Sequence, residues 1–124
     1  MMTSQISRRA AVRVLAAALP VAGLLLFGQD YGRARDMVAR VQADLQRAAD
    51  FTRTNEKERE RYQKVQRRLS DFDSELRKGK FDKGKLDDAI DELKDVVKNN
   101  TLESHDRDTL ATDLSDLRTL RDVR

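Results

Sequence analysis

The chain has 124 residues, of which 38% are charged and none is cysteine. Without cysteine it cannot form the disulfides that stabilise many small secreted domains, so packing alone must hold its fold. The formal net charge of +3 comes from Arg8, Arg9 and Arg13, because the rest of the chain has 22 basic and 22 acidic residues. Overall charge therefore predicts no partner, and in particular no nucleic acid.

The first 28 residues predict an export signal. Arg8 and Arg9 begin a basic segment, and an uncharged apolar run follows at residues 14–28. This order is typical of a signal peptide, and the run is shorter than the roughly 20 apolar residues of a membrane-spanning helix. We expect cleavage near residue 28 and release into the periplasm or outside the cell. The alternative is an uncleaved inner-membrane anchor at residues 14–28.

Residues 29–124 are expected to form a single all-α domain. No glycine or proline occurs between Gly32 and Gly79, and none follows Gly84. Apolar residues at spacings of three and four predict amphipathic helices. We expect three to four helices, arranged as an antiparallel bundle or an elongated helical hairpin assembly, over about residues 31–50, 55–78, 84–98 and 104–121.

The first expected helix carries a narrow apolar stripe with several small side chains. An under-filled face of this kind suits pairing with another helix. We therefore predict that it is a partner seam, for another envelope protein or for a second copy of the chain in a homodimer. The predicted seam consists of Tyr31, Ala34, Val38, Val41, Leu45 and Ala48.

The sequence leaves open whether the first two helices are separate. Either residues 52–55 form a turn, with Asn55 and Glu58 making a capping box, or one helix of about 45 residues runs through. We favour the turn, because the continuous helix would have a polar middle with little to bury it. The second stripe ends at Gly79, a typical left-handed helix stop, and consists of Tyr62, Val65, Leu69, Phe72 and Leu76.

The third and fourth helices are expected to form a hairpin. Asp87 and Lys98 lie in the first and last turns of the third helix, where their charges suit the helix dipole. Apolar stripes mark both helices: Leu86, Ile90, Leu93 and Val97 in the third, and Leu110, Leu114 and Leu117 in the fourth.

A basic stripe runs along the second helix. It consists of Arg53, Lys57, Arg61, Lys64 and Arg68. Basic residues exceed acidic ones in residues 29–68, and the reverse holds in residues 69–124, so the two halves can neutralise each other. We favour ion pairs within the bundle. The alternative is an anionic partner such as a lipid head group or polymer, whose binding salt would weaken.

No residue pattern indicates catalysis, a cofactor or a metal site. Ser104, His105 and Asp106 have the residue types of a catalytic triad, but adjacent helical residues point about 100° apart and cannot form that chain. We expect Ser104 to cap a helix instead. The lysine-rich turn at residues 78–85 lacks the ending of a nucleotide-binding loop and the ligand spacing of a calcium loop. We expect no enzyme and no small-molecule substrate.

Several short segments together resemble a group of small exported bacterial helical proteins. The likeness covers about residues 38–121 and implies a twin-arginine-like or Sec signal peptide followed by a helical domain, without an assigned activity. The segments are Leu69-Ser70-Asp71-Phe72-Asp73, residues 78–84, Asn99-Asn100-Thr101-Leu102 and Asp106-Arg107-Asp108.

These observations predict a non-catalytic interaction or structural module of the cell envelope. The alternatives are a periplasmic chaperone or stress-response protein, and a binder of an anionic envelope surface through the basic stripe.

Overall fold

The computed structural model describes residues 29–52 and 54–123, which form four helices. These are α2 (Gln29–Phe51), α3 (Glu56–Arg77), α4 (Lys83–Asn99) and α5 (Ser104–Asp122). The prediction of an all-α fold is confirmed. The predicted export signal and Arg53 of the basic stripe lie outside the described residues.

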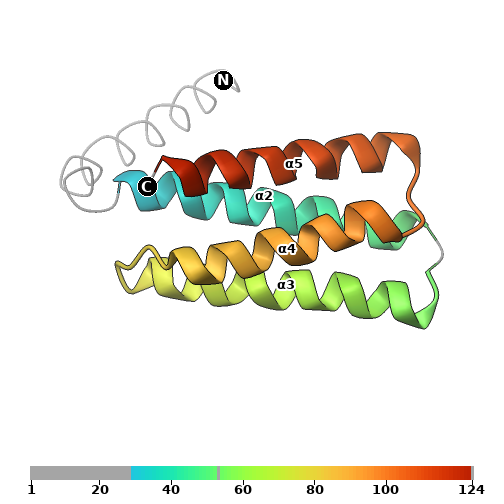
Figure 1. The fold of residues 1–124 in the computed structure, drawn as a ribbon, viewed down its shortest axis with the longest axis horizontal. Helices are drawn as coiled ribbons and strands as arrows, with labels where there is room; N and C mark the ends of the chain where they lie inside the picture. Colours follow the sequence, from blue (N-terminus) through green and yellow to red (C-terminus); the bar gives the residue numbers. More distant parts are fainter. Residues whose placement is uncertain (1–28, 53, 124) are drawn as a thin grey trace, which may run out of the picture.

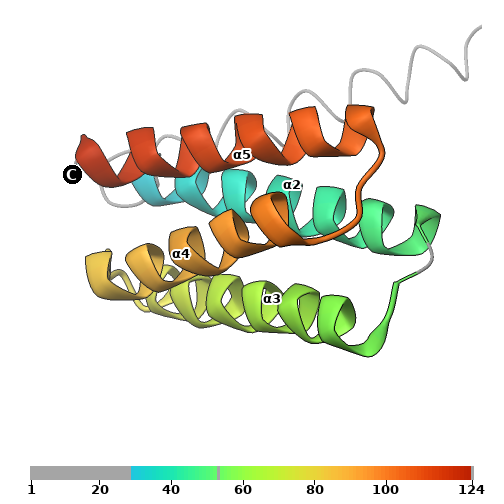
Figure 2. The same ribbon diagram turned by 45° about the vertical axis from the view of Figure 1, so that its right-hand side comes forward.

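The helices form an antiparallel four-helix bundle with up-down-up-down topology (Figure 1). Each helix contacts its neighbours in the sequence, and α5 returns to lie beside α2, as Figure 2 also shows. Within the described part of the chain, the backbones of the diagonal pairs α2–α4 and α3–α5 do not come close to each other. The α3–α4 contact is the most extensive of the four, and the α2–α5 contact is the least. The bundle is therefore the arrangement adopted, and not the elongated assembly.

The turn between α2 and α3 is the one the sequence favoured. The Asn55 side chain accepts a hydrogen bond from the Glu58 backbone N–H at 2.8 Å, and the Glu58 carboxylate accepts one from the Asn55 N–H at 3.3 Å. This reciprocal capping box satisfies two N–H groups that the first turn of α3 cannot pair within the helix. The α2 helix ends at Phe51, so the continuous helix is excluded.

Helix α3 ends at Arg77, and Gly79 forms the predicted left-handed stop just beyond it, with a φ of +82°. The N–H of Lys80 donates to the Glu75 carbonyl at 2.9 Å, and that of Gly79 donates to the Leu76 carbonyl at 3.0 Å. These two bonds are the Schellman pattern, which requires the left-handed conformation that glycine adopts without steric cost.

The start of α5 differs from the expectation. Ser104 is the first residue of the helix, and Glu103 is the N-cap residue, without a side-chain capping bond. The prediction that Ser104 caps this helix is therefore wrong. In the preceding loop, Thr101 is instead bonded to Glu58 at the start of α3.

The predicted partner seam lies inside the protein, so the prediction that it is an exposed interface is wrong. Ala34, Val38, Val41, Leu45 and Ala48 are at most 1% exposed and belong to one core with the apolar stripes of α3, α4 and α5. Tyr31 packs partly buried against this core. The stripe looks under-filled on an isolated helix because its side chains are small, but small side chains allow neighbouring helices to approach closely. It is therefore not a surface on which a partner could dock.

Candidate functional site

The basic stripe is divided between internal contacts and solvent. Arg61 donates to the Asn100 side-chain oxygen at 3.0 Å, and Arg68 lies 3.9 Å from the Glu92 carboxylate. Lys57 and Lys64 are exposed and form no ion pair with any described residue. Pairing within the bundle, the favoured interpretation, thus accounts for two of the stripe's members, although Arg61 uses an amide and not a carboxylate.

A buried polar cluster joins the start of α3 to the loop between α4 and α5. Glu58 is 6% exposed, and its Oε2 accepts hydrogen bonds from the backbone N–H and the hydroxyl of Thr101, both at 2.8 Å. The Thr101 hydroxyl is the largest influence that lowers the pKa of Glu58. Burial acts in the opposite direction, and the Thr101 and Asn55 N–H groups and the Arg61 charge add to the lowering. Glu58 therefore serves as an ionised acceptor.

Asn100 and Arg107 complete this cluster. Asn100 is 2% exposed and donates through its side chain to the Glu58 carbonyl at 3.1 Å. Arg107 donates to the carbonyls of Val97 and Asn100, which lie at the end of α4. The cluster holds the α4–α5 loop against α3 and fixes this end of the bundle.

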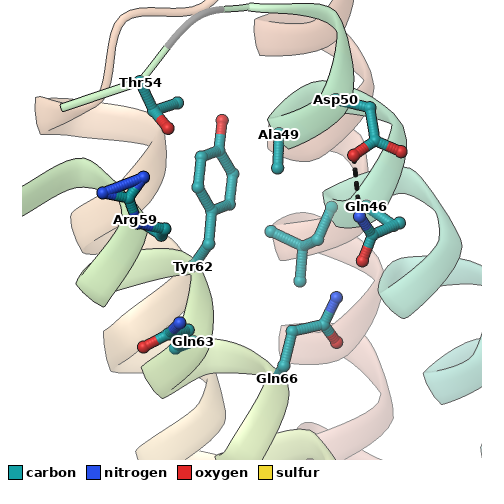
Figure 3. A pocket seen from close by; sticks show the side chains of 9 residues that line it. Gln46, Ala49, Asp50, Thr54, Arg59, Tyr62, Gln63 and Gln66 are labelled. Atoms are coloured by element: carbon teal, nitrogen blue, oxygen red, sulfur yellow. Dashed lines mark hydrogen bonds between the residues drawn. The ribbon is translucent and has the colours of Figure 1, made fainter. Parts of the chain in front are cut away.

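A pocket of about 460 Å³ opens beside the cluster, between the end of α2 and the start of α3 (Figure 3). Its apolar wall comes from Leu45, Ala49 and the ring of Tyr62, and its polar rim comes from both helices and the turn between them. The lining consists of Leu45, Gln46, Ala49, Asp50, Thr54, Arg59, Tyr62, Gln63 and Gln66.

Tyr62 is the unusual member of this lining. The residue is 4% exposed, and its hydroxyl oxygen is buried. In Figure 3 the hydroxyl points toward the gap between Thr54 and Ala49. Burial chiefly raises the pKa of Tyr62, and the charges of Glu58 and Asp106 act in the same direction, whereas a hydrogen bond with the Asn100 side chain lowers it. The phenol is therefore neutral at physiological pH and can both donate and accept.

The rim offers hydrogen-bond donors and acceptors, and it carries both a positive and a negative charge. Gln46 donates to Asp50 at 2.9 Å along α2, and Gln66 donates to the Gln42 carbonyl and so links α3 to α2. Arg59 and Gln63 are exposed on the α3 side. A ligand here would meet a carboxylate on one wall, a guanidinium on the other and side-chain amides between them.

No family model, characterised protein or solved structure matches the chain. The part of the chain that the structure describes contains no group of three or more His, Cys, Asp or Glu side chains arranged to hold a metal ion. Of the helices in residues 29–52 and 54–123, none is both long and apolar enough to cross a membrane.

Sequence reasoning missed this pocket. Of its lining residues, the sequence singled out Leu45 as seam and Tyr62 as core. The polar members resemble ordinary solvated residues of helix ends, and only the packing of α2 against α3 brings them together. Ser104 and His105 are exposed while Asp106 is buried, so these three do not share a face.

Proposed function

We propose that this chain, after export to the cell envelope, acts as a non-catalytic binding module that takes a peptide segment of another envelope protein in the pocket between α2 and α3. The observation that carries the proposal is a pocket of about 460 Å³ that combines an apolar wall with a polar rim carrying Asp50 and Arg59.

A peptide fits the chemistry of the rim. A peptide backbone presents donors and acceptors in alternation, and the rim presents side-chain amides together with Asp50 and Arg59. Ala49 is the partly exposed residue of the apolar wall, so an apolar side chain of the guest can contact it. The volume lies within the roughly 300–1,000 Å³ of typical ligand pockets. Phe51, 64% exposed, ends the helix that forms one wall and offers a further apolar contact.

The described surface favours a specific partner over unfolded clients. Phe51 and Val123 are its exposed large apolar residues, and they lie at the ends of two different helices. A chaperone that cradles unfolded chains uses a broader apolar surface. For the anionic-surface alternative, Arg61 and Arg68 already have partners within the bundle.

The pocket can be tested with a displayed library of random peptides selected on the full chain. Selected peptides should bind the Gln63→Trp variant at least about tenfold more weakly, because the indole fills the pocket. Ser74→Trp is the matched control, since Ser74 is exposed on the same helix and does not line the pocket. Fluorescence anisotropy gives both affinities. Equal affinities for the two variants, or no enriched peptide, would refute the proposed site.

Export is tested separately by the intact mass of the chain recovered from fractionated cells. A soluble species that begins near Gln29 is expected. An uncut chain in the membrane fraction would contradict release and would make residues 14–28 an anchor.

A further inference from the structure

Two buried carboxylates face each other across the α2–α5 contact. Asp44 of α2 is 8% exposed and Asp113 of α5 is 2% exposed, and both line one shallow pocket with Arg40, Thr109, Thr112 and Asp116. Aspartates are rarely buried to this degree unless a cation or hydrogen-bond donors compensate them. The compensation at this contact is incomplete.

Two arginine side chains form the ion pairs of three carboxylates at this contact. Arg40 lies 3.4 Å from Asp113 through Nε and 2.7 Å from Asp116 through Nη2. Asp44 pairs with Arg47, one turn along its own helix, at 2.9 Å. The buried Oδ2 atom of Asp113 has no donor among the described residues. The arrangement lacks one positive charge and one donor, and a single proton supplies both.

The remaining neighbours do not supply that charge. Helix α4 also packs against α5, but its ion pair with α5 joins Asp87 to Arg121, about two turns beyond Asp113. The backbone of α3 does not come close to α5 within the described residues, and no ion pair joins the two helices there. Burial, followed by the hydrogen bond and charge of Asp44, raises the pKa of Asp113 to about 7, while Arg40 opposes this rise and Asp116 adds to it. The largest causes thus come from the packing of α2 against α5.

We propose that Asp44 and Asp113 form a proton-operated latch between α2 and α5, in which the closed bundle holds one shared proton and loss of that proton loosens α5 from α2. A shared proton turns a contact between two acceptors into a hydrogen bond. Its loss leaves two like charges in a poorly solvated contact. The α2–α5 contact is the least extensive in the bundle, and no loop joins its helices, so repulsion acts where the bundle opens most easily.

The sign of the response follows from this raised proton affinity. The closed state binds the proton more tightly than the unfolded chain does, so the contribution of the latch is complete below the ordinary aspartate pKa of 3.8 and is lost as pH rises through about 7. Acidification tightens the α2–α5 contact, and pH values above neutrality weaken it.

The first test is a carboxyl-carbon NMR titration of the full chain from pH 4 to 9. We expect one aspartate signal with a midpoint near 7. This signal should disappear in Asp113→Asn, and its midpoint should fall in Asp44→Asn. Asp108→Asn is the control, because Asp108 is exposed on the same helix and forms no ion pair in the described structure, and it should leave the signal unchanged. Midpoints below 5 for every aspartate in the wild-type chain would overturn the proposal.

The second test asks whether this proton governs the contact between the helices. Amide-exchange protection factors, corrected for intrinsic rates, should fall at least tenfold in α2 and α5 between pH 6 and 8, with a smaller change in α3 and α4. Asp113→Asn should abolish the fall, and Asp108→Asn should retain it. A uniform change over all four helices, or an equal fall in Asp113→Asn, would show that the pair does not act as a latch.

Discussion

Glu58 connects the start of α3 to the α4–α5 loop, so its replacement by alanine should destabilise the bundle substantially. The substitution removes the acceptor of both Thr101 hydrogen bonds and half of the capping box at Asn55. These Thr101 contacts join segments 43 residues apart in the sequence. Their loss therefore acts on the tertiary structure as well as on one helix end.

The magnitude follows from the individual bonds. A hydrogen bond to a charged group contributes about 1.5–3 kcal/mol. Thr101 donates two such bonds at 2.8 Å, whereas the Asn55 N–H bond, at 3.3 Å, is long and weak. Thr101 is exposed, so water can replace part of what is lost. We expect Glu58→Ala to lower the free energy of unfolding by about 2–3 kcal/mol.

Urea denaturation followed by circular dichroism at neutral pH would measure this loss. Glu60→Ala is the matched control, because Glu60 is exposed on the same helix and forms no ion pair with the residues described. It should change stability by less than about 0.5 kcal/mol. If Glu58→Ala costs no more than Glu60→Ala, the cluster does not stabilise the bundle and the reasoning fails.

The pKa of Glu58 adds a pH signature to this prediction. Because that pKa is lowered from 4.5, the contribution of Glu58 is present above pH 4.5 and is lost as pH falls through the folded-state value. The stability difference between the wild-type chain and Glu58→Gln should therefore shrink on acidification below pH 4.5. A constant difference would mean that the ionised form has no special role.

Two further substitutions test the helix ends by urea denaturation. Asn55→Ala should cost about 1 kcal/mol, because it removes the oxygen that accepts the Glu58 N–H, and a loss below a few tenths would contradict that capping role. Gly79→Ala should also cost about 1 kcal/mol, purely from the positive φ, since no atom other than those of its chain neighbours lies within 4 Å of the added carbon. Gly84→Ala, in the first turn of α4, should be neutral or stabilising, because alanine is favoured over glycine in a helix, and an equal loss at both glycines would refute this explanation.

The helices could be predicted because their apolar residues repeat at the helical period. The stripe of α3, from Tyr62 to Leu76, is buried throughout, and the capping box at Asn55 and the stop at Gly79 lie where local sequence places them. Such signals depend on residues within one or two turns of each other. The prediction of a partner seam was wrong for a related reason, because a stripe on one helix does not reveal that other helices cover it.

The functional features depend on contacts that local sequence does not encode. Asn100 is recognisable in the sequence as part of a helix end, but its bonds to Arg61 and Glu58 connect positions 39 and 42 residues away. The burial of Asp113, in contrast, could have been predicted from the sequence pattern. The spacing of Asp106, Leu110, Asp113 and Leu117 places both aspartates on the buried face of α5. An aspartate in phase with core leucines therefore indicates a buried carboxylate.

The two proposals meet in α2, which leads to a last prediction. This helix supplies Gln46 and Asp50 to the pocket and Asp44 to the latch, so a movement of α2 away from α5 also displaces a wall of the pocket. A peptide that prefers the closed pocket must then raise the proton affinity of the Asp44–Asp113 pair by the same factor by which protonation raises the peptide's affinity. A selected peptide should bind the wild-type chain more tightly at pH 6 than at pH 8, and Asp113→Asn should remove most of that difference. Anisotropy titrations at both pH values measure the effect, and an identical pH dependence in the two proteins would show that the pocket and the latch act independently.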